Sequence, residues 1–145
     1  MNFKANFFEE LTTSELYEIA RARTEIFLLE QKIICQDFDG IDYTSLHCFI
    51  EDDGKVLAYL RAFLAEDNTV RIGRVLSIKH GIGLGKTLME KSIPEINKKF
   101  GTFDITLHAQ EYAAGFYKKF GFVPYSVPFM EEGIVHISMI LKKII

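Results

Sequence analysis

The sequence predicts an α/β domain built on a mixed, mostly antiparallel sheet with helices packed against it. Three observations lead to this prediction. Strand-like segments separated by tight turns occupy the middle of the chain, a glycine-rich turn joins the last of them to a long amphipathic segment, and a strand–helix–strand passage follows. With 145 residues, 48% of them hydrophobic, and no linker or repeat, we expect residues 1–145 to form one domain.

The first helix has the clearest start signal. It follows an expected strand at residues 2–9. Thr12 can cap the helix, and Glu15, three residues later, can complete a capping box. Apolar side chains then recur at helical spacing, and the pattern ends in the carboxylate of Glu30. A polar loop, QKIICQDFDGIDYT, comes next.

Three strands joined by short turns follow this loop. Residues 45–51 alternate between two faces, whereas residues 55–66 are apolar on both, so we expect both sides of that strand to be covered. The turns DDGK and EDNT favour antiparallel pairing. The third strand, residues 69–79, runs directly into the glycine-rich loop.

The second half of the chain alternates strands and helices. A helix is expected at residues 84–100 with Gly101 as its stop, and Pro94 should kink it or end it early. A strand, a short helix and two closing strands are expected at residues 103–109, 111–120, 122–127 and 134–143. Strand–helix–strand passages require parallel crossovers, so the sheet should be mixed.

Composition and charge exclude several classes of function. The net charge of −3 argues against general nucleic-acid binding, and no apolar run is long enough to span a membrane. No signal-peptide pattern opens the chain. Cys35 and Cys48 have neither disulfide-motif nor zinc-site spacing, so we expect free thiols and a cytoplasmic protein.

The glycine-rich stretch IKHGIGLGKT points to an anion-binding loop. It does not fit a nucleotide P-loop, whose first glycine would fall at His80, nor a dinucleotide-binding loop, whose third glycine would fall at Lys86. What it retains is a glycine turn at a helix N-terminus, where backbone N–H groups and the helix dipole favour a phosphate. Residues 71–99 hold seven bases against two acids, which also favours an anionic ligand.

Two motifs in the same order resemble those of the GCN5-related N-acetyltransferase (GNAT) superfamily. HGIGLG resembles the coenzyme loop [RQ]-x-x-G-x-[GA], with histidine at the leading position. QEYAAGFYKKFGF resembles N-x-x-A-x-x-x-Y-x-x-x-G-F, with matches at Ala113, Tyr117, Gly121 and Phe122 and with Gln110 in place of the asparagine. The stretches RARTEIFLLEQ, DFDGID, GRV and EEGIVHISM are similar to the ElaA-like branch, a bacterial group.

This resemblance implies a GNAT-like fold, with a splayed central strand pair, and an acetyl-CoA-dependent N-acetyltransferase. In that family an amine attacks the thioester directly, and no metal is needed. The coenzyme-binding residues that the resemblance implies are Val75, Leu76, Ser77, Gly81, Ile82, Gly83, Leu84, Gly85, Lys86, Thr87, Gln110 and Tyr117.

Within that reaction, a backbone N–H near residues 75–77 would stabilise the oxyanion, and Tyr117 would protonate the leaving thiolate. The alternative for Tyr117 is a core position on an apolar helical stripe. The acceptor ammonium must also lose a proton, and four residues could accept it: Glu30, His47, His108 and His136. Of these, His108 and Glu30 are assigned here as catalytic candidates.

Residues 37–42 contain three aspartates, but they lack the EF-hand pattern, so no metal site is expected. Instead Asp39 and Asp42, with Glu30 and His47, are expected to bind a cationic acceptor, either a small amine or a protein amine. A monomer and a homodimer both stay open.

Two other functions also stay open. The first is a coenzyme A-binding or interaction module with little turnover, since the leading Arg/Gln and the Asn of the family motifs are replaced. The second is an acyl-homoserine lactone synthase-like acyltransferase, although that group is expected to carry tryptophans and this chain has none.

Overall fold

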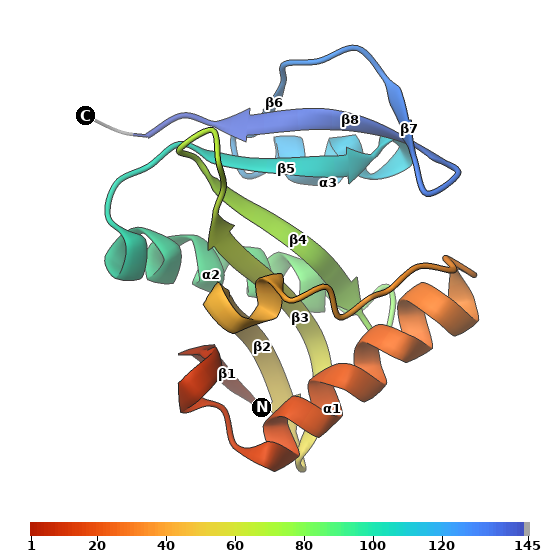
Figure 1. Ribbon diagram of the computed structural model, residues 1–145, viewed down its shortest axis with the longest axis vertical. Helices are drawn as coiled ribbons and strands as arrows, with labels where there is room; N and C mark the ends of the chain where they lie inside the picture. The colour runs from red at the N-terminus through yellow and green to blue at the C-terminus, as the bar shows by residue number, and fades with distance from the viewer. Residues whose placement is uncertain (144–145) are drawn as a thin grey trace.

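The computed structural model describes residues 1–143 and contains one eight-stranded sheet in the order β1-β2-β3-β4-β5-β8-β6, with β7 paired to β8 (Figure 1). The strands are β1 (Asn2–Phe7), β2 (Leu46–Asp52), β3 (Lys55–Leu64), β4 (Val70–Ser77), β5 (Ile105–Gln110), β6 (Val123–Pro124), β7 (Phe129–Glu131) and β8 (Ile134–Leu141). The helical segments are η1 (Phe8–Glu10), α1 (Thr13–Arg23), η2 (Thr24–Glu30), η3 (Ile41–Thr44), α2 (Leu84–Phe100), η4 (Glu111–Ala113) and α3 (Ala114–Lys118). The predicted α/β class and mixed sheet are confirmed.

The predicted start of the first helix is confirmed in detail. Thr12 Oγ1 accepts a hydrogen bond from the Glu15 N–H at 3.0 Å, and Glu15 Oε1 accepts one from the Thr12 N–H at 2.9 Å. The helical path then continues into a seven-residue π-helix, η2, which ends where the Gln31 N–H donates to the Ile26 carbonyl at 2.9 Å. Apolar spacing does not signal a π-helix, so the sequence did not predict this segment. Such segments are rare and occur often at functional sites.

Helices α1 and α2 cover opposite faces of the N-terminal half of the sheet, with α1 in front of β3 and α2 behind it in Figure 1. Because side chains alternate along a strand, each strand supplies two cores. Phe49 and Tyr59 pack with Ile19 under α1, whereas Cys48 belongs with Leu88 to the core under α2. This two-sided burial explains why residues 55–66 read as apolar on both faces.

The sheet splays in its centre, as the resemblance implied. Strands β4 and β5 pair in parallel only from Val70↔Ile105 to Ile72↔Leu107, and beyond these residues they diverge (Figure 1). The remainder of β4 therefore has no strand partner on its β5 side. Backbone groups along that edge are free to meet a ligand.

A bulge in β4 coincides with the splay. Tyr59 pairs with Leu76 and Arg61 pairs with Gly73, so two residues of β4 lie opposite one of β3. Arg74, the first of those two, has a φ of 53°, which is uncommon for a residue with a side chain. Such a conformation costs about 1–2 kcal/mol and persists only where other contacts fix the residue.

Pro94 was predicted to kink α2 or to end it early. Helix α2 extends over all of Leu84–Phe100, so the early end is wrong. The physical reason is the position of the proline. Pro94 and Glu90 both lie on the exposed face, so the carbonyl that loses its intrahelical partner is on the solvent side. Buried Leu88, Met89 and Ile96 hold the opposite face against the sheet.

The C-terminal part differs from the predicted pair of strands. The strand expected at residues 122–127 shortens to β6, and an unpredicted strand, β7, pairs with β8 next to a two-residue turn. Both turn residues, Glu132 and Gly133, have positive φ, at 49° and 75°. Within residues 1–143, no helix is long and apolar enough to cross a membrane.

Candidate active site

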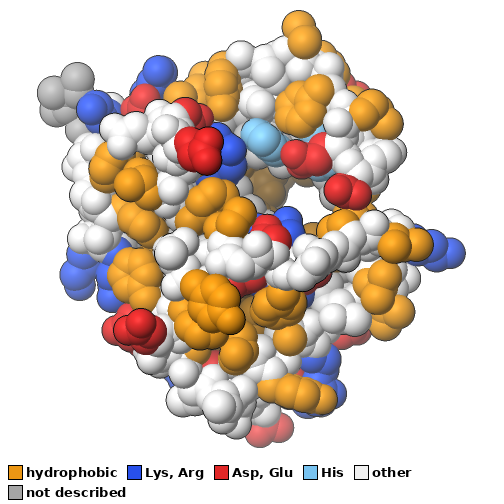
Figure 2. All heavy atoms as spheres, viewed as in Figure 1, with side chains coloured by type: hydrophobic (Ala, Val, Ile, Leu, Met, Phe, Trp, Pro, Cys, Tyr) orange, Lys and Arg blue, Asp and Glu red, His pale blue; other side chains and the backbone are white. Residues whose placement is uncertain are grey.

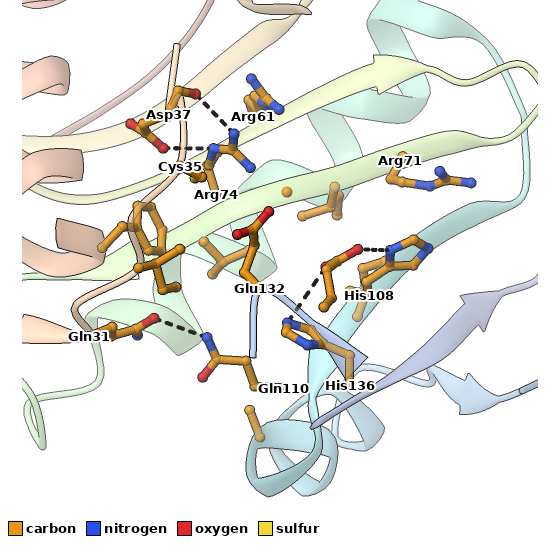
Figure 3. Close-up of a pocket in the computed structure, with 18 of the residues that line it drawn as sticks. Gln31, Cys35, Asp37, Arg61, Arg71, Arg74, His108, Gln110, Glu132 and His136 are labelled. Atoms are coloured by element: carbon orange, nitrogen blue, oxygen red, sulfur yellow. Dashed lines mark hydrogen bonds and ion pairs between the residues drawn. The ribbon is translucent and has the colours of Figure 1, made fainter. Parts of the chain in front are cut away.

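The splay opens into a cavity of about 610 Å³. Its walls come from the end of η2, the loop at residues 31–39, strands β4 and β5, η4 and the β7–β8 turn (Figure 3). The space-filling view shows a hollow between the two halves of the molecule, with histidine and acidic side chains on its upper rim (Figure 2). Asp39, Val75, His108, Gln110 and Tyr117, all predicted as site residues, line the cavity.

Arg23 fastens the loop at residues 36–42, which we call the acidic loop, to the rest of the protein. Its side chain is fully buried at the end of α1. Its Nε donates to Asp37 Oδ2 at 2.8 Å and its Nη1 to Asp42 Oδ1 at 2.6 Å. The guanidinium also lies over the ring of Phe38, 4.1 Å from the centroid. A buried charge needs such partners, so Arg23 sets the path of the loop.

Arg61 and Arg74 form the cavity side of this network. The two Nη atoms of Arg61 each donate to one oxygen of Asp39, both at 2.8 Å. Arg74 Nε forms an ion pair with Asp37 Oδ1 at 2.8 Å, and these contacts fix the strained Arg74 backbone. The hydrogen bonds from Arg61 lower the pKa of Asp39 to about 2.

The structure therefore corrects the prediction that Asp39 and Asp42 attract a cationic acceptor. Asp42 is 4% exposed and is held between Arg23 and Arg61, while Asp39 is bound in bidentate fashion by Arg61. The acidic charges of the loop are thus neutralised within the protein. The arginines are distant from the loop along the chain, so local charge counting missed them. In the described part of the chain, no cluster of three or more His, Cys, Asp or Glu side chains is placed to hold a metal ion.

His47 also lies away from the cavity, contrary to its assignment as an acceptor-binding residue. It is fully buried, with Nδ1 2.7 Å from the Tyr59 hydroxyl and Nε2 2.9 Å from the Asp42 carbonyl. Burial lowers the pKa of His47. Both ring nitrogens are occupied by internal contacts, so His47 supports the acidic loop and does not meet a substrate.

Glu30 is at the end of η2 and does not line the cavity, so its assignment as a catalytic base is not supported. Its Oε1 is 3.2 Å from His80 Nε2 in the glycine-rich loop. Both side chains are partly exposed. His80, which stands at the leading position of the coenzyme motif, is thus engaged with the end of η2.

The glycine-rich loop has the geometry of an anion site. Gly81 and Gly83 both have a φ of 80°, and a Cβ built on either would meet nothing within 4 Å. Gly83 is the N-cap of α2 and provides no side chain, so the first N–H groups of a seventeen-residue helix point outward. Ile82, Lys86 and Thr87 are exposed beside them.

Other residues of the predicted coenzyme set have structural roles. A Cβ on Gly85 would lie 3.3 Å from the ring of Phe116, so Gly85 permits close packing of α2 on α3. Leu84 and Leu76 point into the two cores. Ser77 Oγ donates to the Lys79 carbonyl at 2.9 Å, and this hydrogen bond shapes the start of the loop.

Gln110 ends β5 and reaches across the cleft. Its Nε2 donates to Gln31 Oε1 at 3.0 Å, next to the end of η2 (Figure 3). The end of η2 thus contacts both sides of the splay. Glu30 contacts His80 in the loop that follows β4, and Gln31 contacts Gln110 at the end of β5. Sequence analysis predicted Gln110 but not its partner.

Tyr117 is both a core residue and a cavity residue. Its ring packs edge-to-face on Phe116 and Phe122, and 8% of the residue is exposed. Burial raises the pKa of its hydroxyl, which therefore keeps its proton at neutral pH. This hydroxyl makes no hydrogen bond to any residue in the range 1–143. It is available as a donor to a ligand, so the core and functional interpretations of the sequence are compatible.

The wall opposite the arginines carries a histidine–glutamate–histidine cluster. His108 Nδ1 is 3.1 Å from Glu131 Oε1, and His136 Nε2 is 3.6 Å from Glu131 Oε2. His108 and His136 were candidate bases, and the structure brings them together (Figure 3).

Sequence analysis missed Glu131 and its neighbour Glu132, which also lines the cavity. Glu132 has no ion pair or hydrogen-bonding partner within residues 1–143. The signal for both was the pattern EEG before an apolar segment, which is typical of a hairpin turn. Cys35 also lines the cavity as a free thiol.

Comparisons with known proteins agree with this geometry. The model of the acetyltransferase (GNAT) domain matches residues 28–143. Escherichia coli ElaA is 33% identical over 136 residues, which cover 90% of this chain and 89% of that protein. A UPF0039 protein of Schizosaccharomyces pombe is 34% identical over 146 residues, covering 98% and 97% of the two chains, so relatives extend beyond bacteria.

Solved structures give the same result. The crystal structure of an acyl-CoA N-acyltransferase from Pseudomonas aeruginosa matches with a TM-score of 0.91 at 33% identity, covering 97% of this chain and 99% of that one. A CoA-dependent acyl-homoserine lactone synthase, solved with SAM and isopentyl-CoA, has the same fold at a TM-score of 0.77 but only 14% identity, with 95% and 81% coverage. This chain therefore belongs to the GNAT acetyltransferase family, with ElaA among its relatives.

Proposed function

We propose that the protein is an N-acetyltransferase that uses acetyl-CoA as donor and an amine as acceptor. The main supporting observation is that the splayed strands β4 and β5 and the Tyr117 hydroxyl border one cavity. The start of α2 lies close by, because Gly85 packs against Phe116, the residue next to Tyr117. The exposed N–H groups at Gly83 and the start of α2 bind the coenzyme's pyrophosphate. The unpaired edge of β4 near Val75 accommodates its pantetheine arm.

The bound coenzyme supplies a thioester carbonyl for attack by the amine. A backbone N–H on the free edge of β4 stabilises the oxyanion, because it is fixed in place before the reaction. The Tyr117 hydroxyl donates its proton to the sulfur. His108 removes the proton from the acceptor. Glu132, whose charge is not neutralised by any side chain of residues 1–143, attracts the acceptor ammonium.

A thermal-shift experiment tests coenzyme binding. A ligand at 100 times its dissociation constant stabilises the native state by about 2.7 kcal/mol, which is about 8 °C for a chain of this size. We expect such a shift with acetyl-CoA and a much smaller one with ATP. An ATP shift equal to or larger than the acetyl-CoA shift would contradict the proposal.

Gly83→Ala and Gly54→Ala form a matched pair for the same experiment. Gly54 has a φ of 74° in the β2–β3 turn, Gly83 has 80°, and a Cβ meets nothing within 4 Å at either position. Both variants should lose a similar amount of folding stability, about 1–2 kcal/mol, because alanine is strained at positive φ. Only Gly83→Ala should lose the acetyl-CoA shift, because its methyl group occupies the approach of the phosphate. Equal shifts in both variants would locate the coenzyme elsewhere.

Measurement of turnover distinguishes the proposed N-acetyltransferase from the two other functions that stay open, a coenzyme A-binding module and a lactone synthase-like enzyme. The side chains at both changed motif positions are bound internally, His80 to Glu30 and Gln110 to Gln31, and this observation favours a binding module with little turnover. Release of free CoA thiol with a panel of amines supports the enzyme, whereas acetyl-CoA binding without release supports the module. S-adenosylmethionine in the panel tests the lactone synthase-like reaction.

A further inference from the structure

The β7–β8 hairpin places two aromatic rings, Phe129 and His136, and the Glu131 carboxylate on the face that meets His108 of β5. Phe129 pairs with His136 across the two strands, and Glu131, two residues after Phe129, lies on the same side of β7. The two-residue turn that follows has positive φ at both positions, a pattern that holds hairpins in a fixed register. The position of Glu131 is therefore set by the backbone.

Phe129 fixes the orientation of both histidine rings. It stacks on His136 with an interplanar angle of 25° and meets His108 edge-on at 82°, with a centroid distance of 5.3 Å. A hydrogen bond also fixes the His136 ring, because its Nδ1 donates to the Ile134 carbonyl at 2.7 Å. Its Nε2 therefore faces Glu131 Oε2 at 3.6 Å.

The contact between Glu131 and His108 defines a tautomer. A carboxylate can only accept, so the 3.1 Å contact requires the proton of His108 to be on Nδ1. The lone pair is then on Nε2, which has no hydrogen-bonding partner within residues 1–143. Free imidazole side chains favour the opposite tautomer, so the carboxylate must impose this one.

The exposure of Glu131 argues against a structural role. Its side chain is 44% exposed and that of His108 is 30% exposed. Ion pairs at such positions contribute about 0–1 kcal/mol to folding stability. The charged groups around His108 are Glu131 on β7, Glu132 in the turn, His136 on β8 and Arg71 on β4, and Arg71 is itself paired with Asp67 at 3.0 Å.

We propose that Glu131 is a positioning residue that makes His108 Nε2 the base of the transfer reaction. This inference rests on the proposed function and adds to it a residue that lies outside the two coenzyme motifs, HGIGLG and QEYAAGFYKKFGF. The acceptor ammonium gives up one N–H bond, an N–H bond forms at His108 Nε2, and the positive charge moves to an imidazolium beside the Glu131 carboxylate. The neutral amine then attacks the thioester.

Kinetics of Glu131→Gln, His108→Gln and the double variant test the proposal. His108→Gln should lower kcat about 10²- to 10⁴-fold, the range for one general base, and Glu131→Gln about 10- to 100-fold. The double variant should be no slower than His108→Gln, because Glu131 acts through His108. Full additivity of the two losses, or unchanged kcat in Glu131→Gln, would overturn the role of Glu131.

Glu132→Gln is the matched control, since it removes the same charge from the next residue. It should raise KM for a cationic amine with little change in kcat, whereas Glu131→Gln should lower kcat. Equal kcat losses in the two variants would show a general effect of charge in the cavity and would also refute the positioning role.

A spectroscopic measurement keeps this test independent of the proposed function. Nitrogen NMR of the wild-type protein should show the proton of His108 on Nδ1, and Glu131→Ala should shift it toward Nε2. A wild-type His108 that carries its proton on Nε2 overturns this inference even if the enzyme is active. Failure of every amine to release thiol overturns the proposed function instead.

Discussion

Replacement of Asp42 by asparagine should destabilise the protein severely, although the change is a single oxygen for a nitrogen. Asp42 is 4% exposed, and its Oδ1 accepts from Arg23 at 2.6 Å and from Arg61 at 3.2 Å. The substitution leaves both guanidinium groups without their shared carboxylate in a buried site. Removing one partner of a buried pair costs about 3–5 kcal/mol.

The structure places the expected loss at the lower end of that range. Arg23 keeps its contacts with Asp37, and Arg61 keeps both of its bonds to Asp39, so neither cation is left entirely alone. We expect a loss of about 3 kcal/mol, which lowers the melting temperature by about 10 °C for a domain of this length. The substitution should also loosen the acidic loop, because Asp42 and Asp37 both bind Arg23.

Urea unfolding followed by far-ultraviolet circular dichroism measures this loss, since the chain has no tryptophan for fluorescence. Glu90→Gln is the control, because the Lys86–Glu90 pair at 3.9 Å is exposed and should contribute about 0–1 kcal/mol. If Asp42→Asn lost no more stability than Glu90→Gln, the network would not anchor the loop and the assignment of the acidic loop to a structural role would be refuted.

Further predictions concern Tyr117 and His47. Tyr117→Phe should lower turnover about 10- to 1000-fold with acetyl-CoA binding and melting temperature near wild type, and unchanged turnover in a chemistry-limited assay would remove Tyr117 from the mechanism. Because burial raises the pKa of Tyr117, its ionisation should not limit the alkaline side of the kcat profile below about pH 10. Burial lowers the pKa of His47, so its stabilising contribution is complete above its unfolded pKa of about 6.5 and is lost as the pH falls. The urea midpoint should therefore decline from pH 7 to pH 5, and His47→Gln should flatten that decline; an equal decline in both proteins would contradict the assignment.

Much of the fold could be predicted because its signals are local. The capping box at Thr12 involves residues three apart, and the helix at residues 84–100 is bounded by glycines with positive φ at Gly83 and Gly101. Hairpin turns and two-sided apolar strands also depend on neighbouring residues alone. The effect of Pro94 could not be predicted in the same way, because it depends on which side of the helix faces solvent, and local sequence does not determine that side.

In the candidate site, too, the residues with local sequence signals could be predicted and those whose role depends on distant contacts could not. The sequence alone predicted an anion-binding loop, Tyr117 and His108 as parts of the site, because a glycine turn before a helix and a tyrosine at a fixed spacing are patterns within short segments. The structure places Tyr117 and His108 on the cavity wall and the glycine turn at the start of α2. Sequence analysis assigned the wrong role to Asp39, Asp42 and His47. Their charges and ring nitrogens are matched by Arg23, Arg61 and Tyr59, and those pairings exist only once distant segments fold together.

The sequence by itself determined the α/β class, the order of most elements and the position of a glycine-rich turn at the start of α2. Tertiary structure alone decided which acidic groups are neutralised and which are free. An ionisable side chain acts according to its nearest partners and its burial, and in this protein those partners come from strands and turns far apart in the chain. Glu131 beside His108, 23 residues away and on a neighbouring hairpin, shows the difference most clearly.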